Sequence, residues 1–183
     1  MRGWTLASSA LAPVALVGAW TVGAARQPAA YDPVRDTISA LAAHGAHDPW
    51  VMTGGLVVLG GCHVATAAGL VEARPLGRVV LAAGGVTAAL VAAFPQPSSG
   101  HFPAATASFL ALALWPAVSG LPSRRVGLLA TGGLAVLLGW FSTQLGDGDL
   151  LGLSERVVAG AEALWPLGVV LTLQVRRARH PRR

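Results

Sequence analysis

Six long apolar stretches alternate with short polar segments along this chain of 183 residues. A hydrocarbon core about 30 Å thick is crossed by about 20 helical residues, and most of the stretches come close to that length. They are residues 3–25, 50–70, 79–94, 104–121, 126–145 and 157–175. The stretch 79–94 is the shortest and could gain length from Leu76 or Gln96. The pattern predicts an all-α, polytopic membrane helix bundle with six transmembrane helices.

The composition indicates that lipid is the main solvent of this chain. Hydrophobic residues make up 54% of it and charged residues only 11%, whereas soluble domains carry about 25% charged residues. We therefore expect a single transmembrane domain over residues 1–183. The formal net charge of +5 does not predict a nucleic-acid partner, because five arginines lie within residues 176–183. We interpret that segment as a basic cytoplasmic tail, attracted to anionic lipid.

The arginines are divided unequally between the two sides of the predicted bundle. One side holds ten of them: Arg2, Arg74, Arg78, Arg124, Arg125, Arg176, Arg177, Arg179, Arg182 and Arg183. The other side holds three: Arg26, Arg35 and Arg156. Because short cytoplasmic segments retain positive charge, we expect both termini in the cytoplasm and the protein in the plasma membrane. The first span also has features of a secretory signal, but its apolar stretch is longer than a signal core, which favours an uncleaved helix.

The connection after the first span has the pattern of a short helix. Asp32-Pro33 provides a helix start and Gly45 provides a stop. Apolar residues recur between them at helical spacing, at Val34, Ile38 and Leu41. The pattern predicts an interfacial helix that lies on the outer membrane surface or caps the bundle. Its polar side would carry Arg35, Asp36 and Ser39.

Three histidines lie in the predicted outer segments. His44 and His47 are three residues apart, a spacing that can place two imidazoles on one metal ion, and His101 could supply a third ligand. However, two histidines in a His-Gly-Ala-His turn occur often by chance. We therefore predict no metal site and no cofactor, and keep His44, His47 and His101 as the candidates.

Two ionisable residues fall inside the predicted spans. Glu162 follows Glu155 by seven residues, which puts both carboxyl groups on one helical face and places Glu162 about 10 Å deeper. An ionisable group at that depth indicates a functional site; its alternative role is to join two helices as a paired or protonated carboxyl. His63 lies deeper still, so we predict no direct pair with Glu162. We interpret His63 as a hydrogen-bonding residue of helix packing.

Three segments of the predicted outer side form a combination with a known counterpart. They are Tyr31-Asp32-Pro33-Val34-Arg35-Asp36-Thr37-Ile38-Ser39-Ala40-Leu41, Phe94-Pro95 followed by His101 and Ala105, and Gly152-Leu153-Ser154-Glu155-Arg156. In this order they resemble the bacterial and archaeal membrane family called domain of unknown function 998, and the resemblance covers nearly the whole chain. It implies a six-helix membrane protein whose biochemical role is not established.

The same three segments supply most of the candidate site. The binding candidates are Asp36, Ser39, His101, Glu155, Arg156 and Glu162, and the catalytic candidates among them are His101, Glu155 and Ser39. We expect Asp36, His101 and Arg156 to point into one outward-opening cavity. The carboxylates of Asp36 and Asp32 are the expected partners of Arg156, because a guanidinium pairs well with a carboxylate.

Three functions are consistent with these residues. The leading hypothesis is an outward-facing polar pocket that binds a lipid headgroup or a small amphipathic molecule, or docks a protein partner. The second is a lipid-acting hydrolase or transferase, in which His101 or Glu155 is the general base. In that hypothesis Ser39 or a metal-bound water attacks, and Arg156 holds an anionic headgroup. The third, a proton-coupled transporter using Glu162, ranks lower because the inner half of the bundle offers few polar residues.

Overall fold

The computed structural model describes residues 1–146 and 148–179, so Asp147 and the tail residues 180–183, with Arg182 and Arg183, lie outside the described residues. Six α-helices account for most of the described chain. They are α1 (Thr5–Ala25), α2 (Trp50–Gly69), α3 (Pro75–Ala93), α4 (His101–Ser119), α5 (Arg124–Gln144) and α6 (Leu151–Arg179). Each is long and apolar enough to cross a membrane. The prediction of six spans is confirmed, and the chain is a multi-pass membrane protein.

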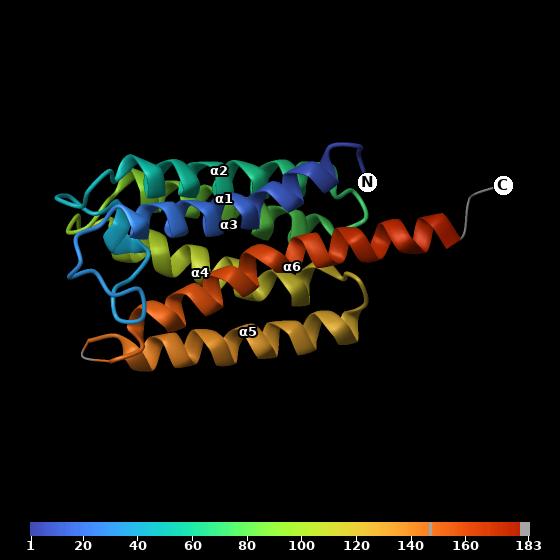
Figure 1. Cartoon of the computed structure of the whole chain (residues 1–183). Helices are drawn as coiled ribbons and strands as arrows, with labels where there is room; N and C mark the ends of the chain where they lie inside the picture. The colour runs from blue at the N-terminus through green and yellow to red at the C-terminus, as the bar shows by residue number, and fades with distance from the viewer. Residues whose placement is uncertain (147, 180–183) are drawn as a thin grey trace.

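Successive helices run in opposite directions, so their connections gather at the two ends of the bundle (Figure 1). The end that carries residues 26–49, residues 94–100 and the connection from α5 to α6 is called the loop end below. The opposite end, called the terminal end, carries Met1, the last turn of α6 and the connections 70–74 and 120–123. Three arginines, Arg26, Arg35 and Arg156, belong to the loop end, and the other described arginines belong to the terminal end.

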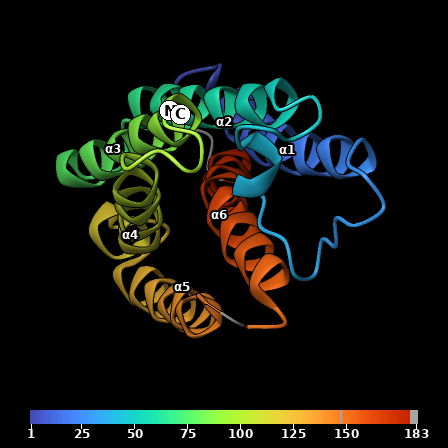
Figure 2. The same ribbon diagram turned by 90° about the vertical axis from the view of Figure 1, so that its left-hand side faces the viewer.

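Viewed from the loop end, α3, α2 and α1 form one arc of the bundle (Figure 2). Helix α6 packs against α1, and α5 packs against α4 and α6 at the edge of the molecule. Small residues permit the closest contacts within the arc. Gly60 of α2 lies against the Gly85 carbonyl of α3, and Gly55 of α2 lies against Ala19 of α1. Because lipid provides no hydrophobic force between helices, such close packing stabilises the bundle.

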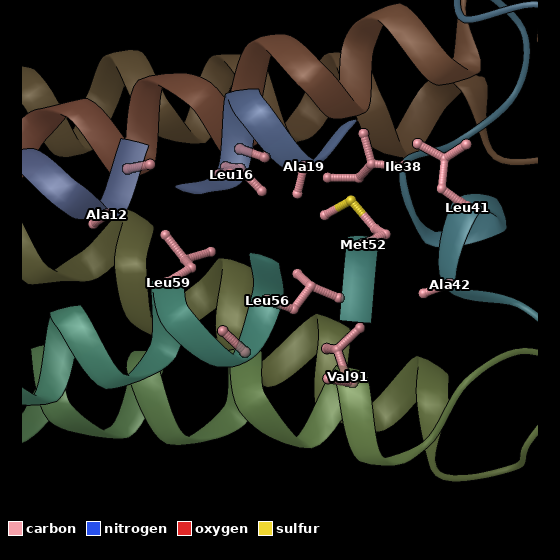
Figure 3. Close-up of a cluster of buried hydrophobic side chains, with 14 of the residues drawn as sticks. Ala12, Leu16, Ala19, Ile38, Leu41, Ala42, Met52, Leu56, Leu59 and Val91 are labelled. Atoms are coloured by element: carbon pink, nitrogen blue, oxygen red, sulfur yellow. The ribbon is translucent and has the colours of Figure 1, made fainter. Parts of the chain in front are cut away.

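Two clusters of buried apolar side chains occupy the two halves of the bundle. The cluster toward the loop end includes Leu16, Met52 and Leu56 of the helices, and Ile38 and Leu41 of the first connection (Figure 3). The cluster toward the terminal end is built from Leu70, Leu81, Leu112, Trp115, Val169 and Val170, among others. The first connection therefore belongs to the core as well as to the surface.

The predicted interfacial helix is replaced by a turn and a short 3-10 helix, η1 (Ser39–Ala42). Asp32 forms the turn, since its carbonyl accepts from Arg35 N at 3.0 Å and its side chain accepts from Val34 N at 2.9 Å. Ile38 and Leu41 are buried against α1 and α2. Ser39, expected on the solvated side, is buried too. The prediction placed this segment on the membrane surface. In the structure its apolar residues are instead inserted into the bundle.

Two helices begin four or more residues earlier than the apolar pattern predicted. Helix α3 starts at Pro75, so the short stretch gains its length on the Leu76 side. Helix α6 starts at Leu151, six residues before the predicted span. As a result Glu155 and Arg156 lie in the second turn of a helix that also carries Glu162.

Candidate functional site

Glu155 joins the first connection to α6. Its side chain is only 3% exposed. Oε2 accepts a hydrogen bond from Ile38 N at 2.5 Å, and Oε1 accepts one from Ser39 Oγ at 3.0 Å. A carboxyl group buried in this way is stabilised by such donors, because they replace the water that it has lost.

Arg156 points to the other side of the same connection. Its Nη1 donates to the carbonyl oxygens of Pro33, Asp36 and Gly152, at 2.7, 2.8 and 2.9 Å. Nη2 donates to the Tyr31 hydroxyl at 2.5 Å. The planar guanidinium suits this cluster because it offers five donors in a fixed fork. Arg156 therefore positions the connection against α6.

The prediction that the carboxylates of Asp36 and Asp32 pair with Arg156 is wrong. The Asp36 carboxylate accepts from Asp32 N at 2.8 Å, and only the carbonyl of Asp36 contacts Arg156. Gly152 makes this arrangement feasible, since a β-carbon there would collide with the Asp36 carbonyl. Arg156 and Asp36 do meet, but through the backbone of the connection.

Tyr31 completes the hydrogen bonds of Arg156. Its hydroxyl accepts from Arg156 and donates to the Thr37 carbonyl at 3.2 Å. Partial burial raises the pKa of the Tyr31 hydroxyl above its ordinary value, although the neighbouring Arg156 guanidinium acts in the opposite direction. The Tyr31 hydroxyl therefore gives up its proton at higher pH than a tyrosine exposed to water.

A cavity of about 250 Å³ opens beside Glu155, between α4, α5 and the first turns of α6. Its polar lining comprises Thr37, Ser39, Gln96, His101, Thr106, Ser142 and Glu155. Its apolar lining comprises Phe102, Ala105, Phe109, Leu110, Leu138, Phe141 and Leu145. We call this space the outer cavity. It brings together the three catalytic candidates Ser39, His101 and Glu155, whereas Asp36 and Arg156 do not line it.

His101 is held in one orientation at this cavity. It is 6% exposed, and its Nδ1 donates to the Phe94 carbonyl at 2.9 Å. With the proton on Nδ1, the neutral ring has a free acceptor at Nε2. His101 is also the first residue of α4, so the loop before it and the helix after it fix its place.

A second cavity, of about 50 Å³, lies deeper among the helices and is called the deep cavity. Ser39, Ala105, Phe109 and Glu155 line both cavities, which makes the two spaces neighbours. The remaining polar lining of the deep cavity is His63, Ser108 and Glu162. Gln96, Thr37 and Ser142 of the outer cavity, and Ser108 of the deep one, are lining residues that sequence reasoning did not identify.

One sequence prediction about His63 is corrected by the structure, and another is confirmed. Both of its ring nitrogens lack a hydrogen-bond partner among the described residues, so it is not a hydrogen-bonding residue of helix packing. His63 and Glu162 line the same cavity, but no hydrogen bond joins them among the described residues, so the prediction of no direct pair is confirmed. The difference in depth is smaller than predicted because α6 begins at Leu151: Glu162 is eleven residues from that start, and His63 is thirteen from Trp50, the start of α2.

His44 and His47, two of the candidate metal ligands, line neither cavity. His44 N donates to the Gln96 carbonyl at 3.0 Å, and the backbone of His47 is bonded in both directions by the Gln27 side chain. Within residues 1–146 and 148–179, no three side chains of His, Cys, Asp or Glu are gathered as a metal site.

The comparisons with known proteins agree with the motifs. A family model described as a protein of unknown function (DUF998) matches residues 10–172, from within α1 to within α6. Comparison with curated proteins and with solved structures finds no match. All three motif segments and both cavities lie within the matched range. The chain therefore belongs to the DUF998 family of proteins of unknown function.

Proposed function

We propose that this membrane protein binds a lipid or a small amphipathic molecule in the outer cavity. The observation that carries the proposal is the division of its lining into two kinds of side chain. Ser39, His101 and Glu155 supply hydrogen-bonding groups where the first connection meets α4 and α6. Leu110 and Leu138 supply apolar surface from α4 and α5. Such a lining suits a molecule with a polar head and an apolar tail.

The size of the cavity fits part of such a molecule. Its volume of about 250 Å³ exceeds the roughly 150 Å³ of an apolar cavity that holds benzene. It lies just below the about 300 Å³ at which ordinary ligand pockets begin. Phe102, Leu110 and Leu145 are exposed at its border, so an alkyl chain could continue into the surrounding lipid.

We propose that the loop end faces the exterior of the cell and that both termini are cytoplasmic. The arginine distribution supports this orientation, since short cytoplasmic segments retain positive charge and only Arg26, Arg35 and Arg156 belong to the loop end. In the plasma membrane the outer cavity would then take its ligand from the outer leaflet or from outside the cell.

Binding is tested with a cavity-filling variant. Protein in phosphatidylcholine nanodiscs is equilibrated with radiolabelled dodecanol, and binding to empty nanodiscs is subtracted. Ala105 lines both cavities, whereas Ala107 on the same helix is exposed. We expect saturable binding that Ala105→Trp weakens at least about ten-fold and Ala107→Trp leaves unchanged. Absence of saturable binding would reject the proposal and favour the docking of a protein partner instead.

A second candidate, lipid hydrolysis, is favoured by one contact. Ser39 Oγ lies 3.0 Å from the Glu155 carboxyl, a distance suited to a nucleophile and its general base. Hydrolysis of p-nitrophenyl dodecanoate in proteoliposomes tests it. A rate that Ser39→Ala abolishes supports the enzyme, and a rate equal to that of empty liposomes rejects it for this ester.

A further inference from the structure

The deep cavity contains two buried polar side chains that the outer cavity does not use. His63 is completely buried and Glu162 is 2% exposed. Both ring nitrogens of His63, and Oε1 of Glu162, have no hydrogen-bond partner among the described residues. Burying a polar atom without a partner is unfavourable. Two side chains in this condition on the wall of one cavity indicate that something binding there completes their hydrogen bonds.

The charged residues that line the deep cavity indicate which charge its ligand carries. Glu155 and Glu162 line the deep cavity, and its described lining includes no arginine. Arg156, the nearest arginine in sequence, is engaged by three carbonyl oxygens and Tyr31 on the other side of the connection. An anionic headgroup would therefore meet carboxyl groups with no cation to balance them. A cation is favoured.

The size of the cavity and its free atoms restrict the cation further. About 50 Å³ has room for a few atoms of water size, since one water needs about 10–15 Å³ on the same measure. A primary ammonium is one heavy atom with three N–H donors. Glu162 Oε1 and the unprotonated nitrogen of a neutral His63 are acceptors that such donors fit. A trimethylammonium group is bulkier and has no N–H to donate.

The deep cavity adjoins the outer cavity on the side of the loop end. Ser39, Ala105, Phe109 and Glu155 form walls of both cavities. Toward the terminal end, the apolar cluster around Trp115, with Leu81 and Val170, fills the bundle. A ligand would thus enter head first, with its ammonium near Glu162 and its tail in the outer cavity.

We propose that the deep cavity is the subsite for a protonated primary amine, so that the ligand of this protein is an amine-bearing amphiphile. The inference rests on the proposed function, because it places the head of the same ligand whose tail occupies the outer cavity. It assigns Glu162 as the carboxylate that binds the ammonium and His63 as a second acceptor.

The experiment compares three probes of equal chain length: dodecylamine, dodecyltrimethylammonium and dodecanol. Each is equilibrated at neutral pH with the full chain in phosphatidylcholine nanodiscs, with empty nanodiscs subtracted. The wild-type protein should bind dodecylamine about ten-fold more tightly than either other probe, as one charge-assisted hydrogen bond predicts. The isosteric variant Glu162→Gln should bind dodecylamine no better than dodecanol, with dodecanol binding unchanged.

A control variant separates the subsite from general surface charge. Asp149→Asn removes an exposed carboxylate of the loop end, which pairs with Arg35 and lines neither cavity, and should keep the preference for the amine. Equal binding of the three probes by wild-type protein would overturn the inference, as would a preference that survives in Glu162→Gln. If dodecanol binds without an amine preference, only the amine subsite fails; if no probe binds, the proposed function fails. The wild-type comparison decides the matter even if Glu162→Gln does not fold.

Discussion

Ser39 Oγ donates a hydrogen bond of 3.0 Å to Oε1 of Glu155, although the two residues are 116 positions apart in the chain. Ile38 N donates to the other oxygen of the same carboxyl group at 2.5 Å. These two bonds attach the first connection to α6. Since Ser39 and Glu155 also line both cavities, the contact that fixes the connection shapes the candidate site as well.

Replacing Glu155 by Gln should lower the free energy of unfolding by about 1–3 kcal/mol, because the amide offers one acceptor where the carboxyl group offers two. Unfolding of the purified protein in mixed detergent micelles measures the loss. Ser39→Ala should cost less, since it removes one donor and leaves the bond from Ile38 N intact. The double variant should lose less than the sum of the two changes. Fully additive losses would contradict a shared hydrogen-bond network.

Arg156→Lys should destabilise the protein by about 1–3 kcal/mol, since one ammonium cannot reach three carbonyl oxygens and the Tyr31 hydroxyl together. Arg35→Lys is the matched control. Arg35 pairs with Asp149 at 3.1 Å on the exposed surface, where ion pairs contribute about 0–1 kcal/mol. The same unfolding assay compares the two, and equal losses would show that Arg156 does not hold the connection.

Gly152→Ala should be destabilising by about 1–3 kcal/mol, because its β-carbon would meet the carbonyl groups of Asp36 and Pro33. Gly168→Ala, in the same helix, should be neutral or stabilising. A β-carbon at Gly168 meets no atom within 4 Å, and alanine is the better helix former. Thermal unfolding midpoints of the two variants give the comparison. A neutral Gly152→Ala would mean that the connection sits farther from α6.

The ionisation of Tyr31 should be displaced upward and can be observed directly, since the chain has a single tyrosine. Its pKa is raised by burial in the folded protein, so the folded state holds this proton at pH values where the unfolded state releases it. The stability that it contributes is therefore fully present below the unfolded pKa and is lost as pH rises through the folded pKa. Absorbance of tyrosinate should appear at higher pH in folded than in unfolded protein. Coincident titrations would contradict the burial of this ring.

The sequence predicted the number of helices because six apolar stretches of membrane-crossing length leave few alternatives. It also placed Ser39, His101 and Glu155 in one site, because each belongs to the loop end. It failed for Arg156, since a sequence displays carboxylates such as Asp36 but not the direction of backbone carbonyl groups. The inward position of Ser39 could not be read either, because it depends on Glu155 of a distant helix.

The sequence also overestimated the difference in depth between His63 and Glu162, although it correctly predicted that they form no direct pair. An apolar pattern marks where hydrophobic residues begin, whereas α6 already begins at Leu151. Glu162 is therefore nearly as far along α6 as His63 is along α2. The sequence did contain a sign that α6 begins before residue 157. The segment 152–156 has no proline, and its only helix breaker is one glycine.

The orientation of the bundle can be measured independently of any ligand. Reporter proteins fused after Arg183 or inserted within residues 74–77 should report the cytoplasm, and one inserted near Gly148 should report the exterior, as the arginine distribution predicts. Fluorescence and periplasmic phosphatase activity read the two sides. An exterior signal from the C-terminal fusion would reverse the orientation and move the outer cavity to the cytoplasmic side.

Photolabelling shows directly whether an amphiphile binds in the outer cavity. A dodecanol carrying a diazirine on its chain is irradiated with the protein in nanodiscs, and the labelled residues are identified by peptide mass spectrometry. Saturable labelling is expected within residues 101–110 and 138–145, which line the cavity from α4 and α5. Unlabelled dodecanol should compete with this labelling, which should be lost in Ala105→Trp but not in Ala107→Trp. Labelling spread evenly over the lipid-facing residues of all six helices, and unchanged by Ala105→Trp, would contradict binding in the outer cavity.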